Sequence, residues 1–245
     1  MYYENDPFQD RLTNAKSALT NALADEYIRT GLARLGVDEN KLNEGMALYQ
    51  RAEQLYQLQK KEYSEQFEAG RIMYKAWDDA MKDMKLFTTV AHLVLNDVPK
   101  MKEQLGLDGI RKTSIPDWIA WAKLFFTNAL ASPEILQKFG THLITVEMLQ
   151  AGSLKVTAFE AAHAKQRFEM GEAQQATRDR DAAFEELDKF MYMLKKIAKS
   201  VLTEKPEYLE KLGILKRSAP IRKKKVVKTT VAAEEKPANQ EITGE

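Results

Sequence analysis

The chain has 245 residues, of which 44% are hydrophobic and 30% are charged, with a net charge of +1 and no cysteine. This composition is sufficient to bury a core, and the lack of cysteine excludes disulfides and thiolate metal sites. With only 7 prolines and 11 glycines, the chain is expected to have few turns and long helices.

The N-terminal region has no basic start followed by an apolar run, and no part of the chain is an uninterrupted apolar stretch long enough for a membrane span. We therefore expect neither a signal peptide nor a transmembrane helix, and a cytoplasmic location.

Apolar residues recur every three or four positions from Phe8 to Leu23 and predict an amphipathic helix that ends near Ala24. The apolar residues of segment 27–35 either continue this helix or form a second short one. A turn is predicted at 36–40, where Asp38 is a suitable N-cap for the next helix.

A very long helix is predicted from about Glu39 to Asp97, because no proline interrupts this stretch and apolar residues recur along it every seven positions. A helix of about 59 residues would be roughly 88 Å long, so it either projects as an arm or kinks, with Gly70 as the favoured kink. A second row, from Gly45 to Val94, is apolar at both ends and polar in the middle. We interpret the first row as core packing in preference to a platform for stacking bases; it contains Leu42, Tyr49, Tyr56, Tyr63, Gly70, Trp77, Met84 and Ala91.

The long helix ends before Pro99, and a short helix from Lys100 to Leu105 is closed by Gly106 as a left-handed cap. Ser114 and Pro116 then open the most apolar helix of the chain, and a short helix follows between Pro133 and Gly140. A second long helix is predicted from about Thr145 to Glu204. The last predicted helix covers 206–212, with Gly213 after it.

An internal duplication becomes visible when the sequence is shifted along itself by 107 residues. Roughly twenty identities then align over about a hundred positions without a gap, where chance gives about six. They include Leu42 with Leu149, Gly45 with Gly152, and Gly106 with Gly213. The two long helices are therefore predicted to be copies of each other.

Glu160 and His163 are the only metal-like pair, since the Glu-x-x-His spacing places both side chains on one helix face, as in carboxylate-bridged metal bundles. The first repeat has Glu53 and Tyr56 at the matching positions, so a second such motif is missing. We therefore favour a structural role for His163 and expect no cofactor.

Two further groups of residues suggest contacts with partners. Trp118, Trp121 and Phe125 belong to an aromatic cluster that is either core or an oligomer or partner surface. Lys223, Lys224 and Lys225 lie in a basic run that could hold the phosphates of nucleic acid or of anionic lipids. An acidic stretch follows the run, and we predict disorder from about residue 215 to the end.

The segment Pro206–Ile214 has the pattern P-x-x-L-E-x-L-G-I and is preceded by Arg180-Asp181-Ala182-Ala183 and Leu187-Asp188. In these features residues 178–217 resemble a group of uncharacterised bacterial all-helical proteins. The resemblance implies a bacterial origin and carries no function or site residues.

Taken together, these patterns predict an all-α protein made of two duplicated long-helix units. The units are residues 1–107 and 115–214, with a linker at 108–114 and a disordered tail at 215–245. We expect an elongated, antiparallel, four-helix-bundle-like architecture with a pseudo-two-fold axis. The favoured function is a non-catalytic, self-associating scaffold or interaction protein. The alternatives are a metal-binding bundle using Glu160 and His163, and a nucleic-acid or anionic-surface binder using the basic tail.

Overall fold

The structure is a computed structural model that describes residues 6–109 and 114–214. The predicted disordered tail at 215–245 lies outside these residues. The described part is all-α and contains α1 (Pro7–Ala24), α2 (Glu26–Ala33), α3 (Glu39–Val94), α4 (Pro99–Gln104), α5 (Ile115–Ala131), α6 (Pro133–Gly140), α7 (Val146–Val201) and α8 (Pro206–Lys211).

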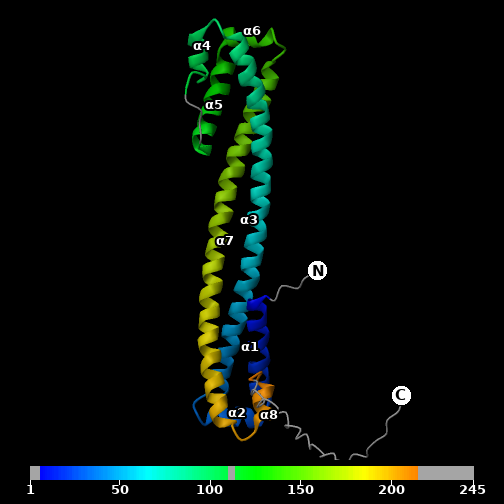
Figure 1. The fold of residues 1–245 in the computed structure, drawn as a ribbon, viewed down its shortest axis with the longest axis vertical. Coiled ribbons are helices and arrows are strands. Elements are labelled where there is room, and N and C mark those ends of the chain that lie inside the picture. The colour runs from blue at the N-terminus through cyan, green and yellow to red at the C-terminus, as the bar shows by residue number, and fades with distance from the viewer. Residues whose placement is uncertain (1–5, 110–113, 215–245) are drawn as a thin grey trace, which may run out of the picture.

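The two long helices, α3 and α7, pack antiparallel along nearly the whole molecule (Figure 1). Each has 56 residues, which corresponds to a rod of about 84 Å. α3 continues as an unbroken helix through Gly70 and packs along its length against α7, so it neither ends at the glycine where a kink was expected nor projects alone as an arm. Both helices end about three residues earlier than predicted, because Leu95 and Leu202 leave helical geometry to form a turn before Pro99 and Pro206.

Most helix ends follow from local sequence signals. The Asp38 side chain accepts a hydrogen bond from the backbone N–H of Lys41, and Ser114 caps α5 by accepting from the N–H of Asp117. Gly106 and Gly213 close α4 and α8 with positive φ angles of 65° and 67°. Gly140 does not act in this way, since the left-handed residue after α6 is Leu143, with a φ of 60°.

The shorter helices gather at the two ends of the rod. The first end module comprises α1, α2, α8, the N-terminal half of α3 and the C-terminal half of α7. The second end module comprises α4, α5, α6 and the opposite halves of α3 and α7. Each end module therefore combines the beginning of one repeat with the end of the other (Figure 1).

Matching contacts show that the two end modules are built alike. In the first, the side-chain amide of Asn21 donates to the backbone carbonyl of Lys211 at 2.6 Å. In the second, Asn128 donates to the carbonyl of Gln104 at 2.5 Å. Both partners of the second bond are the repeat counterparts of those in the first. The duplication in the sequence is thus expressed as a pseudo-two-fold relation between the ends.

Among residues 6–109 and 114–214, the middle of the rod consists of α3 and α7 alone. α1 begins beside Tyr56, and α5 begins beside Trp77, so neither helix covers the stretch between these residues. The expected four-helix arrangement therefore does not extend along the whole molecule, because the shorter helices are too short to meet. Between the two long helices the middle seam is poor in large apolar side chains; it contains Gln59, Glu62, Gln66, Ala69, Gln166, Glu169, Ala173 and Ala176.

Candidate functional site

The candidate metal pair, Glu160 and His163, makes contacts within the chain. Glu160 forms an ion pair with Lys123 of α5. The His163 ring is half-buried, with its centroid 6.2 Å from that of Phe159. Among the described residues, no group of three potential ligands includes either side chain. Nothing in this geometry adds the further ligands that a metal centre needs.

The aromatic cluster on α5 lies in the core of the second end module. Trp118 and Phe125 are buried, with exposed fractions of 6% and 0%. Trp121 is half-buried, and its indole N–H donates to the carbonyl of Gly106 at 2.9 Å. These residues therefore contribute mainly to the core of the chain. Only Trp118 and Trp121 also line a surface cavity, which is described below. The other predicted interaction residues, Lys223, Lys224 and Lys225, lie outside the described residues.

Several exposed aromatic side chains lie in the middle of the rod, where sequence reasoning placed core. Tyr63 follows Tyr49 and Tyr56 in the heptad row of α3, and we predicted all three to be buried. Tyr49 and Tyr56 are buried, but Tyr63 is 51% exposed, so the prediction for Tyr63 is wrong. Its neighbours on the same helix face, Phe67 and Tyr74, are 78% and 67% exposed. The physical reason is that the N-terminus of α1 lies beside Tyr56, one heptad short of Tyr63, so α1 does not cover these three side chains.

The helix positions on either side define this surface as a notch. Along the same heptad row, Phe8 of α1 stacks near Tyr56 at 6.2 Å between ring centroids. Two heptads beyond Tyr63, Trp77 packs against Trp118 of α5 at 4.6 Å. Among the residues that the structure describes, this row is therefore covered by α1, then uncovered, then covered by α5. We call the uncovered part the notch; it comprises Tyr63, Phe67, Gly70 and Tyr74 of α3.

The register of the two long helices adds a residue of α7 to the notch. Arg51 pairs with Glu186 at 3.0 Å, and Asp83 pairs with Lys155 at 2.7 Å. In sequence, Phe67 lies midway between Arg51 and Asp83 of α3, and Met170 lies about midway between Lys155 and Glu186 of α7. The two residues therefore stand at the same level of the rod. Met170 is also the repeat counterpart of Tyr63, so the pseudo-two-fold relation places it on the same face, and it is 36% exposed. We therefore include Met170 in the notch.

The edge of the notch at α1 is fixed by polar contacts. The Tyr56 hydroxyl donates a hydrogen bond to the Asp6 carboxylate, which also caps α1 by accepting from the backbone N–H of Phe8. Lys60 lies 3.6 Å from the same carboxylate. The hydrogen bond from Tyr56 is the main reason that the pKa of Asp6 lies below its ordinary value. This network ties the N-cap residue of α1 to α3 and so holds the edge of the notch in place.

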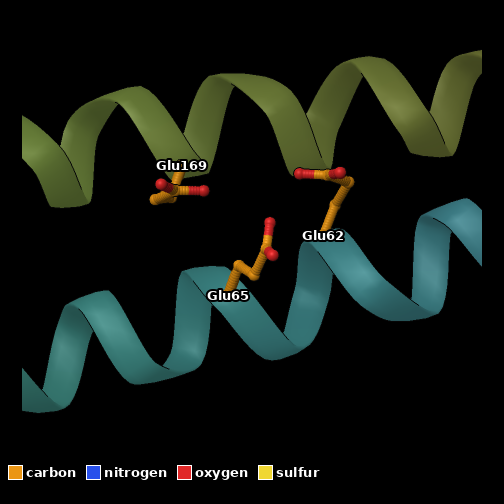
Figure 2. Close-up of side chains that lie close together, drawn as sticks. All are labelled: Glu62, Glu65 and Glu169. Carbon is orange, nitrogen blue, oxygen red and sulfur yellow. The ribbon is translucent and has the colours of Figure 1, made fainter.

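Three carboxylates converge between the long helices near the notch (Figure 2). Glu62 and Glu65 come from α3 and Glu169 from α7, and their nearest oxygens all lie within 4.8 Å of one another. Glu62 is only 9% exposed, whereas Glu65 is exposed. Lys61 offsets part of the charge, at 3.6 Å from Glu62 and 3.2 Å from Glu65. Such a group can attract cations, but it also opposes close packing of the helices.

Sequence reasoning missed both this acidic group and the notch. The polar middle of the second heptad row did indicate a weak seam, since Gln59 and Gln66 stand in it. The meeting of Glu62 with Glu169, however, depends on the register between helices about a hundred residues apart in the chain. No pattern within either helix specifies that register.

Comparison with protein-family models, with curated proteins and with solved structures finds no match for this chain. No helix in residues 6–109 and 114–214 is long and apolar enough to cross a membrane.

Proposed function

We propose that the protein is a non-catalytic helical scaffold that self-associates through the notch, so that the notch of one copy packs against the notch of a second. The observation that carries this proposal is the set of exposed aromatic side chains at Tyr63, Phe67 and Tyr74, in the one stretch where only two helices are present. Contiguous exposed apolar surface of this kind is typical of interaction sites.

The chemistry of the middle seam supports a second copy as the occupant. The end modules bury Phe, Leu and Met side chains, but the middle holds Gln, Glu and Ala between its helices and presents its aromatic residues outward. Two long helices from a second copy would cover these rings and turn the middle into a four-helix arrangement. The stretch that is weakest in the isolated chain would then gain the most from association.

Symmetry and size support the same occupant. Two identical surfaces facing each other form an isologous interface, and the notch lies near the pseudo-two-fold axis of the chain, where crossing rods can meet. At about 150–250 Å² per aromatic side chain, the three exposed rings offer roughly 400 Å² of apolar surface. This is about half of the 800 Å² or so that each partner contributes to a standard interface, which leaves room for a polar rim.

The two alternatives from the sequence gain no comparable support. Glu160 is paired with Lys123, and the basic tail lies outside the described residues. We therefore keep self-association as the proposed function.

Sedimentation velocity and light scattering on the full chain test this proposal. We expect the wild type to be a dimer at micromolar concentration, because the notch exposes three aromatic side chains on one helix face. A variant with Phe67→Glu and Tyr74→Glu should be a monomer with unchanged helix content, since both side chains are mostly exposed, at 78% and 67%.

The matched control replaces Leu93 and Leu154 with glutamate, because these residues are equally exposed, at 64% and 70%, but lie outside the notch. This control should remain a dimer. A wild type that is monomeric at 100 μM (about the upper limit for a useful Kd), or a notch variant that remains dimeric, would contradict the proposal.

A further inference from the structure

The second end module contains a surface cavity of about 1170 Å³, between the C-terminal half of α3, the first turns of α5 and residues 106–109. This is somewhat larger than the range of about 300–1,000 Å³ that is usual for small-molecule sites. Its wall is aromatic: the Trp77 and Trp118 ring centroids lie 4.6 Å apart, and those of Trp118 and Trp121 lie 6.5 Å apart. Met81 and Met84 extend this apolar wall along α3.

The tryptophan-lined side of the cavity is apolar. The indole N–H of Trp121 is bonded to the carbonyl of Gly106, so the ring presents carbon atoms to the cavity. The other large apolar side chains of the lining are the Met and Trp residues already named, together with Ile115 and Leu107, while His92 and two lysines add polar groups along α3. Such a wall suits a hydrocarbon chain better than a sugar or a nucleotide.

The duplicated architecture provides an internal comparison for this cavity. In the first end module, Arg11 stands at the position of Trp118 and Asp188 at that of Met81. Arg11 donates from Nε to Asp188 at 3.3 Å, and its guanidinium lies 4.6 Å from the centroid of the Phe184 ring, the counterpart of Trp77. An ion pair over an aromatic ring therefore occupies the place where the second end module has an apolar hollow. The hollow is a property of one end, and the shared fold does not require it.

The rim of the cavity is cationic. Lys82 and Lys85 are exposed lining residues, and neither has a described carboxylate within 4.0 Å. The counterpart of Lys82 in the first end module, Lys189, is paired with Glu185 at 2.6 Å. Asp78 is the one acidic residue in the lining, so the rim carries an excess of positive charge beside the apolar wall.

We propose that this cavity binds a long-chain fatty carboxylate, with the hydrocarbon chain against Trp77, Trp118 and Trp121 and the carboxylate at Lys82 and Lys85. The apolar wall supplies the affinity through burial of the chain, and the lysines select an anionic head group over a neutral one. This site is separate from the notch and does not depend on self-association.

The chain itself provides the probe, because all three of its tryptophans line this cavity. Titration of the full-length protein with dibrominated stearate should quench tryptophan fluorescence with saturation, since bromine quenches only at short range. Palmitate should compete with the brominated acid, and hexadecanol, which has the same chain length and no charge, should compete at least ten times less strongly. Absence of saturable quenching, or equal competition by hexadecanol, would overturn the proposal.

A double charge reversal, Lys82→Glu with Lys85→Glu, should weaken palmitate binding at least tenfold and leave hexadecanol binding unchanged. Both lysines are exposed, so the fold should persist, which circular dichroism checks; the single variant Lys85→Ala gives the same test with a smaller change. The matched control, Lys195→Glu with Lys199→Glu, reverses exposed lysines at the corresponding stretch of α7 and should bind palmitate as the wild type does. Equal binding by the Lys82/Lys85 variant and the wild type would refute the assigned head-group position.

Discussion

At the scale of single residues, one glycine at each end of the rod allows the helices there to pack closely. Gly45 and Gly152 are repeat counterparts. A Cβ on Gly45 would lie 2.6 Å from a ring atom of Phe190 and 2.9 Å from Leu19. A Cβ on Gly152 would lie 2.7 Å from both Phe126 and Phe87. Aromatic rings occupy the space that a methyl group would need, so the identity at this position reflects packing.

We expect Gly45→Ala and Gly152→Ala each to lower the free energy of unfolding by about 1–3 kcal/mol, because the rings cannot move without disturbing a close-packed core. The control is Gly171→Ala, where a Cβ would meet nothing within 4 Å. This change should raise stability by about 0.5–1 kcal/mol through helix propensity alone. Urea unfolding followed by circular dichroism measures all three variants. A Gly45→Ala protein as stable as the wild type would show that the ring of Phe190 has room to shift.

At the scale of elements, one long helix meets three different environments. α3 packs under α1 at Tyr49 and Tyr56, stands beside α7 alone from Lys60 to Tyr74, and packs under α5 from Trp77 onward. The middle stretch contributes little apolar burial. It also places the carboxylate of Glu62 in the seam, beside those of Glu65 and Glu169 (Figure 2). The helix is therefore held mainly by its two ends.

Replacing Glu62 with leucine should raise the free energy of unfolding by about 1–2 kcal/mol, since it removes a buried charge and adds apolar surface to the seam. Thermal and urea unfolding at one fixed protein concentration would measure the change. Glu68→Leu is the control: Glu68 is exposed and paired with Arg71 at 2.6 Å, and its loss should change stability by no more than about 0.5 kcal/mol. A destabilised Glu62→Leu protein would mean that the carboxylate has a favourable role in the seam.

At the scale of the whole molecule, the two repeats exchange their halves. The first end module takes its core from segments 12–56 and 183–214, which belong to different repeats. The core of the second spans 73–159 and also crosses the boundary between repeats. The arrangement is that of a two-fold dimer whose subunits have become one chain. Neither repeat contains a complete end module.

Fragments cut between Gly109 and Ser114 should therefore fold only in association. Alone, neither 1–109 nor 114–245 should give a cooperatively unfolding monomer, whereas co-expression should yield a stable complex with the helix content of the intact chain. Co-purification through a tag on one fragment, followed by thermal unfolding, measures this. A folded monomer from either fragment would contradict the exchanged arrangement.

The features that the sequence predicted correctly are local. Asp38, Ser114, Gly106 and Gly213 cap their helices through residues within five positions in the chain, and such signals can be recognised without a structure. The heptad rows likewise predicted the two long helices. The duplication suggested two equivalent halves, and the matched bonds of Asn21 and Asn128 show how closely those halves agree.

The features that the sequence did not predict depend on where separate helices stop. Tyr49, Tyr56 and Tyr63 have the same residue type and spacing, but the third is exposed because α1 begins beside the second. Lengthening α1 by two turns would have made the prediction correct. The acidic group depends in the same way on the register between α3 and α7. The cavity beside Trp118 depends on a difference between the repeats, because Trp118 stands where the first repeat has Arg11.

The split core of the first end module also has a consequence for the order in which the protein can form during synthesis. The second end module needs only a continuous stretch of chain that is complete once residue 159 has left the ribosome. The first end module needs residues up to Ile214, so α1 and α2 cannot complete their packing until residues 183–214 have been synthesised. Because such distant contacts are slow to close, the second end should form first and act as a clamp that brings the two long helices together. During synthesis the apolar faces of α1 and α2 would thus stay exposed until the last helices are made, and this end of the molecule should be the more prone to aggregation.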